Sequence, residues 1–280
     1  MSTDNKRSAV GAHLQKPDLK TSRRNFIAGV STLAGALVAT AVARKPAVAD
    51  HTPGHACDTS AEPHNPHCLV CFLSGTRIAT PDGDVAVEKL RIGDLVTCVS
   101  GSPTQIKFIG RSRHTRAASE AWRPGLTPVK VSRFALDGRT PHADLYLSRG
   151  HSVYLDGLLV PVQNLVNGLS IIENCCADAL TLEYYHIDLE NHAVVFAEGA
   201  PAETWQGDKY WTFDNADEYV RLYGVPKGMK QPFAPILSYH GRRRELVSRL
   251  RSVVSPIYDV REPLDVIRDE IAARAELALA

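Results

Sequence analysis

Apolar and polar residues alternate in short runs between residues 71 and 199. Alternation over about four to eight residues predicts half-buried β-strands, because successive side chains of a strand point to opposite faces. Turn residues such as Pro81-Asp82-Gly83 and Asp156-Gly157 separate the runs. We therefore expect a compact, mainly β domain with strands at residues 76–80, 85–87, 95–99, 105–109, 128–134, 145–148, 152–155, 180–188 and 193–197.

The pattern changes to helical spacing after residue 205. Apolar residues three or four positions apart indicate helices with one buried face, and Asp214 is the expected N-cap of the first of them. The chain from 205 to 280 is thus predicted to be a mainly helical extension, with helical segments at residues 213–223, 235–254 and 263–279. One further helical turn is expected at residues 161–166.

The first 49 residues have the features of an export signal. Ser22-Arg23-Arg24-Asn25-Phe26-Ile27 resembles the twin-arginine signature, an Ala- and Gly-rich apolar run follows, and Ala47-Val48-Ala49 resembles a cleavage site. The alternative is a transmembrane helix, but the run is short and only moderately apolar. We expect the twin-arginine translocase as a partner, a periplasmic or secreted location, and a mature chain that does not span the membrane.

Residues 50–70 form a predicted linker arm rich in His, Cys and Pro. Its histidines and cysteines match no structural zinc pattern, so neither a metal nor a cofactor is predicted. A disulfide between Cys57 and Cys68 and a soft-metal site are alternatives for this arm. Cys68 and Cys71 form a C-x-x-C, but a strand rather than a helix is expected after it, which disfavours a thioredoxin-like site.

The net charge of +1 is unevenly distributed. The first 49 residues hold eight Lys or Arg and two Asp or Glu, whereas the remainder holds 24 and 29, a net charge of −5. Binding to nucleic acid depends on a basic surface. Nucleic acid is therefore not an expected partner.

Three sequence boxes follow one another between residues 71 and 204. The first holds a cysteine, a Gly-Thr pair and an L-x-x-G-D-x-V segment; the second is Ser148-Arg149-Gly150-His151; the third begins at Tyr185 and continues into Ala200-Pro201-Ala202-Glu203-Thr204. In this order the boxes resemble the Hint domain, the module shared by Hedgehog C-terminal domains and inteins. The resemblance implies a β-horseshoe fold over residues 71–204.

The resemblance also implies self-cleavage. The Cys71 thiol would attack the carbonyl carbon of Val70 and convert the peptide bond into a thioester. His151 would give a proton to the departing amine, and Ser148, which replaces the threonine of the family, would orient the scissile amide. Candidates for activating the thiol or polarising the carbonyl are His186 and His192. A small nucleophile of unknown identity would then resolve the thioester.

The departures from the family limit the second step. Inteins end in His-Asn followed by Cys, Ser or Thr, whereas this chain continues after Gly199 without them, so splicing is not expected. Nothing in residues 205–280 indicates a sterol site. Two alternatives are a non-catalytic Hint-fold binding or structural module and a periplasmic metal-binding protein that uses the His/Cys arm.

Several candidates have purely structural interpretations. His186 could be a core residue, and Cys98 lies in a strand pattern typical of the core. Asn191-His192 is expected at the turn of the last hairpin, where the imidazole of His192 would be exposed. These interpretations compete with the catalytic ones.

Signal and scissile bond lie on the same short arm. Twin-arginine export carries folded proteins, so cleavage before Cys71 in the cytoplasm would separate the signal from its cargo. The sequence therefore predicts that cleavage is delayed until after export or does not occur.

Overall fold

Two antiparallel sheets form the core of this computed structural model, which describes residues 70–173, 175–207, 209–237 and 262–278. One sheet has the order β10 (Ile171–Ile172), β6 (Val129–Val131), β7 (Leu145–Leu147), β1 (Phe72–Leu73), β11 (Thr181–Leu189), β5 (Pro103–Thr115) and β4 (Leu95–Thr97). The other has the order β3 (Gly83–Ala86), β2 (Arg77–Thr80), β12 (Val194–Ala197), β13 (Ala200–Glu203), β8 (Ser152–Leu155) and β9 (Leu158–Pro161). The predicted mainly β fold is confirmed.

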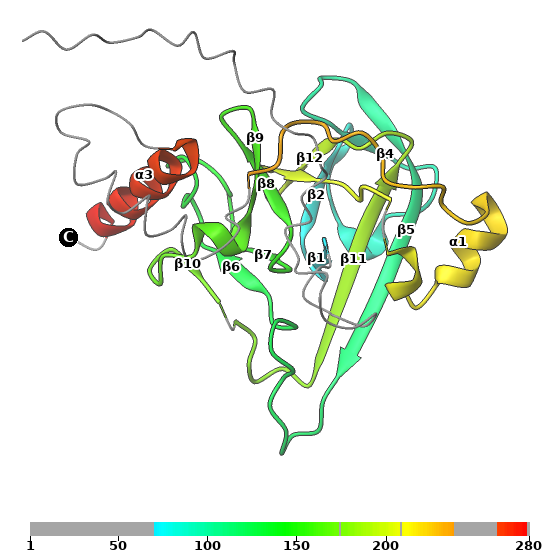
Figure 1. The fold of residues 1–280 in the computed structure, drawn as a ribbon, viewed down its shortest axis with the longest axis horizontal. Helices are drawn as coiled ribbons and strands as arrows, with labels where there is room; N and C mark the ends of the chain where they lie inside the picture. The colour runs from blue at the N-terminus through cyan, green and yellow to red at the C-terminus, as the bar shows by residue number, and fades with distance from the viewer. Residues whose placement is uncertain (1–69, 174, 208, 238–261, 279–280) are drawn as a thin grey trace, which may run out of the picture. The chain divides into compact units, whose positions relative to one another are not determined.

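The longest strands, β5 and β11, pair over nearly their whole length (Figure 1). Along β5 the side chains of Arg111 and Arg113 alternate with a buried Ser112. The strand extends well beyond the expected residues 105–109. Backbone pairing with β11, rather than apolar side chains, supports its second half.

The last hairpin differs from the prediction. β11 and β12 belong to different sheets, so Asn191-His192 connects the sheets and does not form a hairpin turn. The last hairpin pairs β12 with β13 and turns at Glu198 and Gly199, whose φ angles of 48° and 78° are both positive. Two positive φ values in a two-residue turn match the right-handed twist of the strands that it joins.

Apolar side chains from both sheets form one core. The helix α3 (Pro263–Leu277) adds Leu264, Ile267 and Ile271 to it, as its predicted apolar face indicates. The 3₁₀ helix η3 (Val162–Leu165) accounts for the helical turn expected at 161–166. Cys98 is 2% exposed and belongs to the core, as predicted.

The extension after residue 205 covers the outer edge of β5. Backbone groups that point away from β11 are bonded by residues between 212 and 223: Asp214 accepts the N–H of Arg113 at 2.8 Å, and the Tyr223 hydroxyl donates to the carbonyl of Lys107 at 2.6 Å. Unpaired strand edges invite association with other chains, and here the extension satisfies the edge.

The helix α1 (Ala216–Tyr223) belongs to this segment and lies beside β5 (Figure 1). It starts after Asn215, and the expected N-cap Asp214 instead bonds the strand. The short 3₁₀ helices η2 (Val87–Lys89) and η4 (Tyr210–Thr212) complete the described elements. The predictions for residues 1–49 and for the arm up to residue 69 lie outside the described residues, as does most of the helix expected at 235–254.

In the described part of the chain, no helix combines the length and the apolar character needed to cross a membrane.

Candidate functional site

Cys71 precedes β1, which lies in the middle of the seven-stranded sheet between β7 and β11. Its side chain is completely buried. Ser148, which follows β7, bonds both sides of this residue: its Oγ accepts the N–H of Cys71 at 2.8 Å, and its own N–H donates to the Cys71 carbonyl at 3.0 Å. The nitrogen of the Val70–Cys71 bond is thereby held in a fixed orientation.

The Cys71 thiol contacts His186. The distance from Sγ to His186 Nε2 is 2.6 Å, and His186 reaches the thiol from β11, the strand paired with β1. Burial raises the pKa of Cys71 well above its usual value and lowers the pKa of His186 to about 3. Both groups are thus neutral at neutral pH, and the imidazole is placed to accept the thiol proton.

His151 follows Ser148 by three residues and is also buried. A turn fixes it, since its N–H donates to the Ser148 carbonyl at 3.0 Å and its carbonyl accepts the N–H of Val162 at 2.9 Å. The buried ring lies edge-on to Phe72, with 4.4 Å between the ring centroids. Burial lowers the pKa of His151 to about 4, opposed by the Glu203 carboxylate and by the backbone of Cys71 and Glu203.

The imidazole of His192 is 5% exposed, so the expectation of an exposed turn residue is wrong. The N–H of Phe233 donates to its Nδ1 at 2.9 Å. This bond joins the segment that connects the two sheets to the extension. The Nε2 of His192 lies 3.5 Å from Glu203 Oε2. His192 is thus joined to Glu203, whereas His186 is the histidine at the thiol.

Glu203 is a buried charged residue to which sequence reasoning assigned no role. It ends β13, and its Oε1 accepts the N–H of Ser152 at 2.6 Å. No signal in the sequence pointed to it, because this strand was not predicted; only the structure shows a buried carboxylate at the end of a strand in which Ala200 and Ala202 are small and apolar. Such a position requires a polar partner inside the domain.

Phe213 of the extension covers His186. The ring centroids lie 4.5 Å apart, and Trp205 packs against Phe213 at 5.1 Å. Gly110 pairs with His186 across the β5–β11 ladder, and a Cβ at position 110 would lie 2.6 Å from the Phe213 ring. Glycine at this position therefore allows the aromatic cover to approach the site.

A buried ion pair fixes the next part of the extension. The Lys230 ammonium donates to the Asp188 carboxylate and to the carbonyl of Leu189, both at the end of β11. Burial raises the pKa of Asp188, and the nearby Lys230 opposes this shift. The pair anchors the extension to the strand that carries His186.

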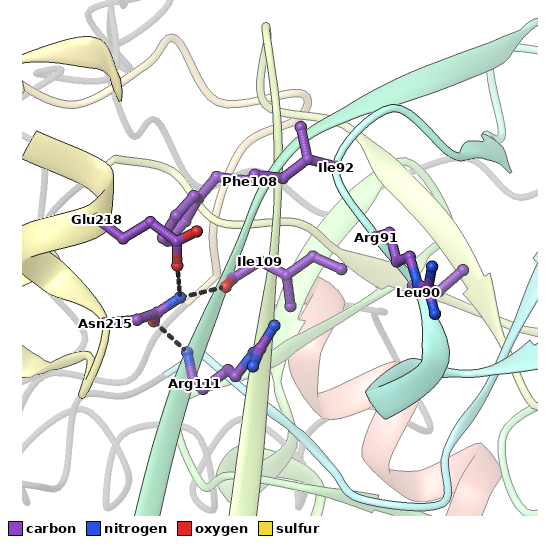
Figure 2. A pocket seen from close by; sticks show the side chains of 8 residues that line it. All are labelled: Leu90, Arg91, Ile92, Phe108, Ile109, Arg111, Asn215 and Glu218. Carbon is purple, nitrogen blue, oxygen red and sulfur yellow. Dashed lines mark hydrogen bonds between the residues drawn. The ribbon is translucent and has the colours of Figure 1, made fainter. Parts of the chain in front are cut away.

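A hollow of about 220 Å³ lies at the outer edge of β5. Figure 2 shows the side chains that line it. The side-chain amide of Asn215 borders it, donating to the carbonyl of Ile109 at 3.0 Å and to Glu218 at 3.2 Å (Figure 2). None of the five predicted site residues lines this hollow. It is thus separate from the thiol site.

Within the described ranges, no group of three or more His, Cys, Asp or Glu side chains is arranged to hold a metal ion. The His/Cys arm, on which the metal-binding alternative depends, lies outside those ranges.

Residues 70–209, half of the chain, match the family model of the Hint domain. Together with the two sheets and the C-terminal helix, this match confirms the predicted fold class. No curated protein matches the chain.

Similar solved structures include the gp41-1 intein, with 16% identity, 47% of this chain and 97% of that chain covered, and a TM-score of 0.34. The MchDnaB-1 intein is 12% identical; the match covers 46% of this chain and 98% of that chain, with a TM-score of 0.31. A bacterial intein-like domain from Clostridium thermocellum is 13% identical; the match covers 49% of this chain and 99% of that chain, with a TM-score of 0.29.

Proposed function

Because this chain belongs to the Hint domain family, we propose that it cleaves its own backbone between Val70 and Cys71 through a thioester. One observation carries the proposal: two different groups hold the two reacting ends of Cys71. Its thiol lies 2.6 Å from the imidazole of His186, and its amide nitrogen lies 2.8 Å from the hydroxyl of Ser148. An N-to-S acyl shift needs control of both atoms.

In the first step, His186 accepts the thiol proton as Sγ attacks the Val70 carbonyl carbon. The tetrahedral intermediate then breaks its C–N bond, and the minor protonated form of His151 gives its proton to the departing nitrogen of Cys71. His186 has then gained one proton, and His151 has lost one. The product is a thioester on Cys71 with a free α-amine, and the proton count of the site is unchanged.

In the second step, a small nucleophile attacks the thioester. A thiol, an amine, an alcohol or water would release the chain up to Val70 and leave a protein that begins at Cys71. Splicing is not proposed, since no Asn followed by Cys, Ser or Thr closes the domain.

A non-catalytic Hint fold is the second candidate. The complete burial of Cys71 and the aromatic cover on His186 favour it, because both limit access of a second nucleophile. In that case the site residues would serve as core polar groups, and the thiol would never leave its neutral state.

The deciding experiment incubates the folded protein with hydroxylamine, with dithiothreitol or with neither, and measures intact masses. We expect a fragment that begins at Cys71 and, with hydroxylamine, a hydroxamate on Val70. Hydroxylamine also attacks Asn-Gly bonds, and the chain has one at Asn167-Gly168, so the mass must identify the cut. Protein denatured in guanidinium serves as the control. If the folded protein forms no such fragment under any condition, the non-catalytic candidate is supported instead.

A related proposal concerns the order of export and cleavage. The first 49 residues support the proposal that the twin-arginine translocase carries the folded domain out before cleavage. We expect wild type in the periplasm and a variant with Arg23→Lys and Arg24→Lys retained in the cytoplasm as an uncleaved chain. Cell fractionation with mass analysis tests this. A chain starting at Cys71 that accumulates in the cytoplasm would contradict the delay.

A further inference from the structure

A buried carboxylate lies beside the proton-donor side of the site. Glu203 is 4% exposed, and its Oε1 accepts the N–H of Ser152, the residue that directly follows His151. The strands place it there, because β13 pairs with β8. A buried charge is costly unless other groups compensate it, so its partners indicate its role.

The second carboxylate oxygen faces His192. Because the N–H of Phe233 donates to His192 Nδ1, that nitrogen carries a lone pair. In a neutral imidazole the proton then lies on Nε2, the nitrogen 3.5 Å from Glu203 Oε2. The proton on Nε2 thus lies near the carboxylate without a hydrogen bond to it, and the polar ring is a close neighbour of the Glu203 charge.

The charge of Glu203 acts on His151. Glu203 is the largest influence opposing the fall in pKa that burial imposes on His151, and His192 acts weakly in the opposite direction. For His186, by contrast, burial and His151 both lower the pKa, and no carboxylate opposes them. The imidazoles of His151 and His186 thus differ by one negative neighbour.

This difference matches the two proton transfers of the proposed cleavage. The base at the thiol must be neutral, whereas the acid at the amine must carry a proton, and a nearby carboxylate stabilises a protonated imidazole. We infer that Glu203 is a positioning residue that fixes the backbone next to His151 and stabilises the protonated form of its imidazole. Its catalytic part rests on the proposed function.

The variant Glu203→Gln tests the inference in the full chain. Glutamine keeps an oxygen that can accept the Ser152 N–H but removes the charge. We expect the rate of hydroxylamine-dependent cleavage to fall about tenfold or more, and its pH profile to move to lower pH as protonated His151 becomes harder to form. Glu198→Gln is the matched control, since Glu198 also accepts a backbone N–H, that of Arg77 at 2.7 Å, in the same hairpin.

A second readout does not depend on cleavage. In the Cys71→Ala background, NMR titration of His151 should give a midpoint roughly one pH unit lower after Glu203→Gln and an unchanged midpoint after Glu198→Gln. That shift would support the link between Glu203 and His151 even if wild type never cleaves. An unchanged midpoint, or a cleavage rate and pH profile equal to those of the Glu198 control, would overturn the inference.

Discussion

The Cys71→Ala variant is expected to lose nucleophile-dependent cleavage completely. The thiol is the only group of Cys71 that can form the thioester, and it is the thiol that lies at His186. The fold should survive, because the main-chain bonds of residue 71 to Ser148 do not involve the side chain. Intact mass after hydroxylamine treatment measures the outcome.

Cys98→Ala is the matched control for this variant. Cys98 is also a buried thiol of the β domain, and burial raises its pKa as well. It should cleave like wild type, with a small loss of stability from the missing sulfur atom. Cleavage before residue 71 that persists in Cys71→Ala would show that the bond breaks by another route, and the thioester would be abandoned.

The His186→Gln variant is expected to slow cleavage by roughly 10²- to 10⁴-fold, the usual contribution of a general base. Burial holds the pKa of the Cys71 thiol high, so thiolate is scarce near neutral pH and the attack depends on a neighbouring acceptor. Glutamine is of similar length but does not accept the proton. Single-turnover rates at a fixed hydroxylamine concentration give the comparison.

His114→Gln is the control for a histidine in the same strand pair. His114 lies on β5 opposite Leu182, and burial lowers its pKa, but its ring faces Tyr184, whereas the imidazole at the thiol is that of His186. Its cleavage rate should match wild type within a fewfold. Circular dichroism and thermal melting separate slow chemistry from unfolding. A His186→Gln protein that is folded and cleaves at the wild-type rate would remove His186 from the reaction.

Where apolar side chains alternate clearly, the strands were predictable, as β2 and β8 show. The strand β13 was not expected, because Ala-Pro-Ala-Glu has weak strand propensity and only its neighbours β12 and β8 hold it in place. The second half of β5 was missed for the same reason. Polar residues there owe their conformation to pairing, which local sequence does not record.

At the candidate site, sequence boxes identified the side chains but not their partners. Cys71, Ser148 and His186 come together because β1 lies between the strands that carry or precede the other two. His186 lies within β11 and His192 follows its end, so the sequence alone does not show which of them reaches the thiol. The pairing of β11 with β1 identifies His186. Phe213 and Phe233 carry no recognisable motif, and only the folded extension reveals their contacts with the site.

The position of Phe233 along the chain determines when the contacts of the cysteine site can be completed during synthesis. It follows Cys71 by 162 residues, and its main chain holds His192 while Phe213 covers His186. At a synthesis rate of 5 to 20 residues per second, the ribosome needs roughly 10 to 30 s to reach it after making Cys71. During that interval the first 49 residues are already synthesised while the contacts of the cysteine site are still incomplete. Under the proposed export, the translocase can therefore recognise the amino-terminal residues before the site proposed for cleavage is complete.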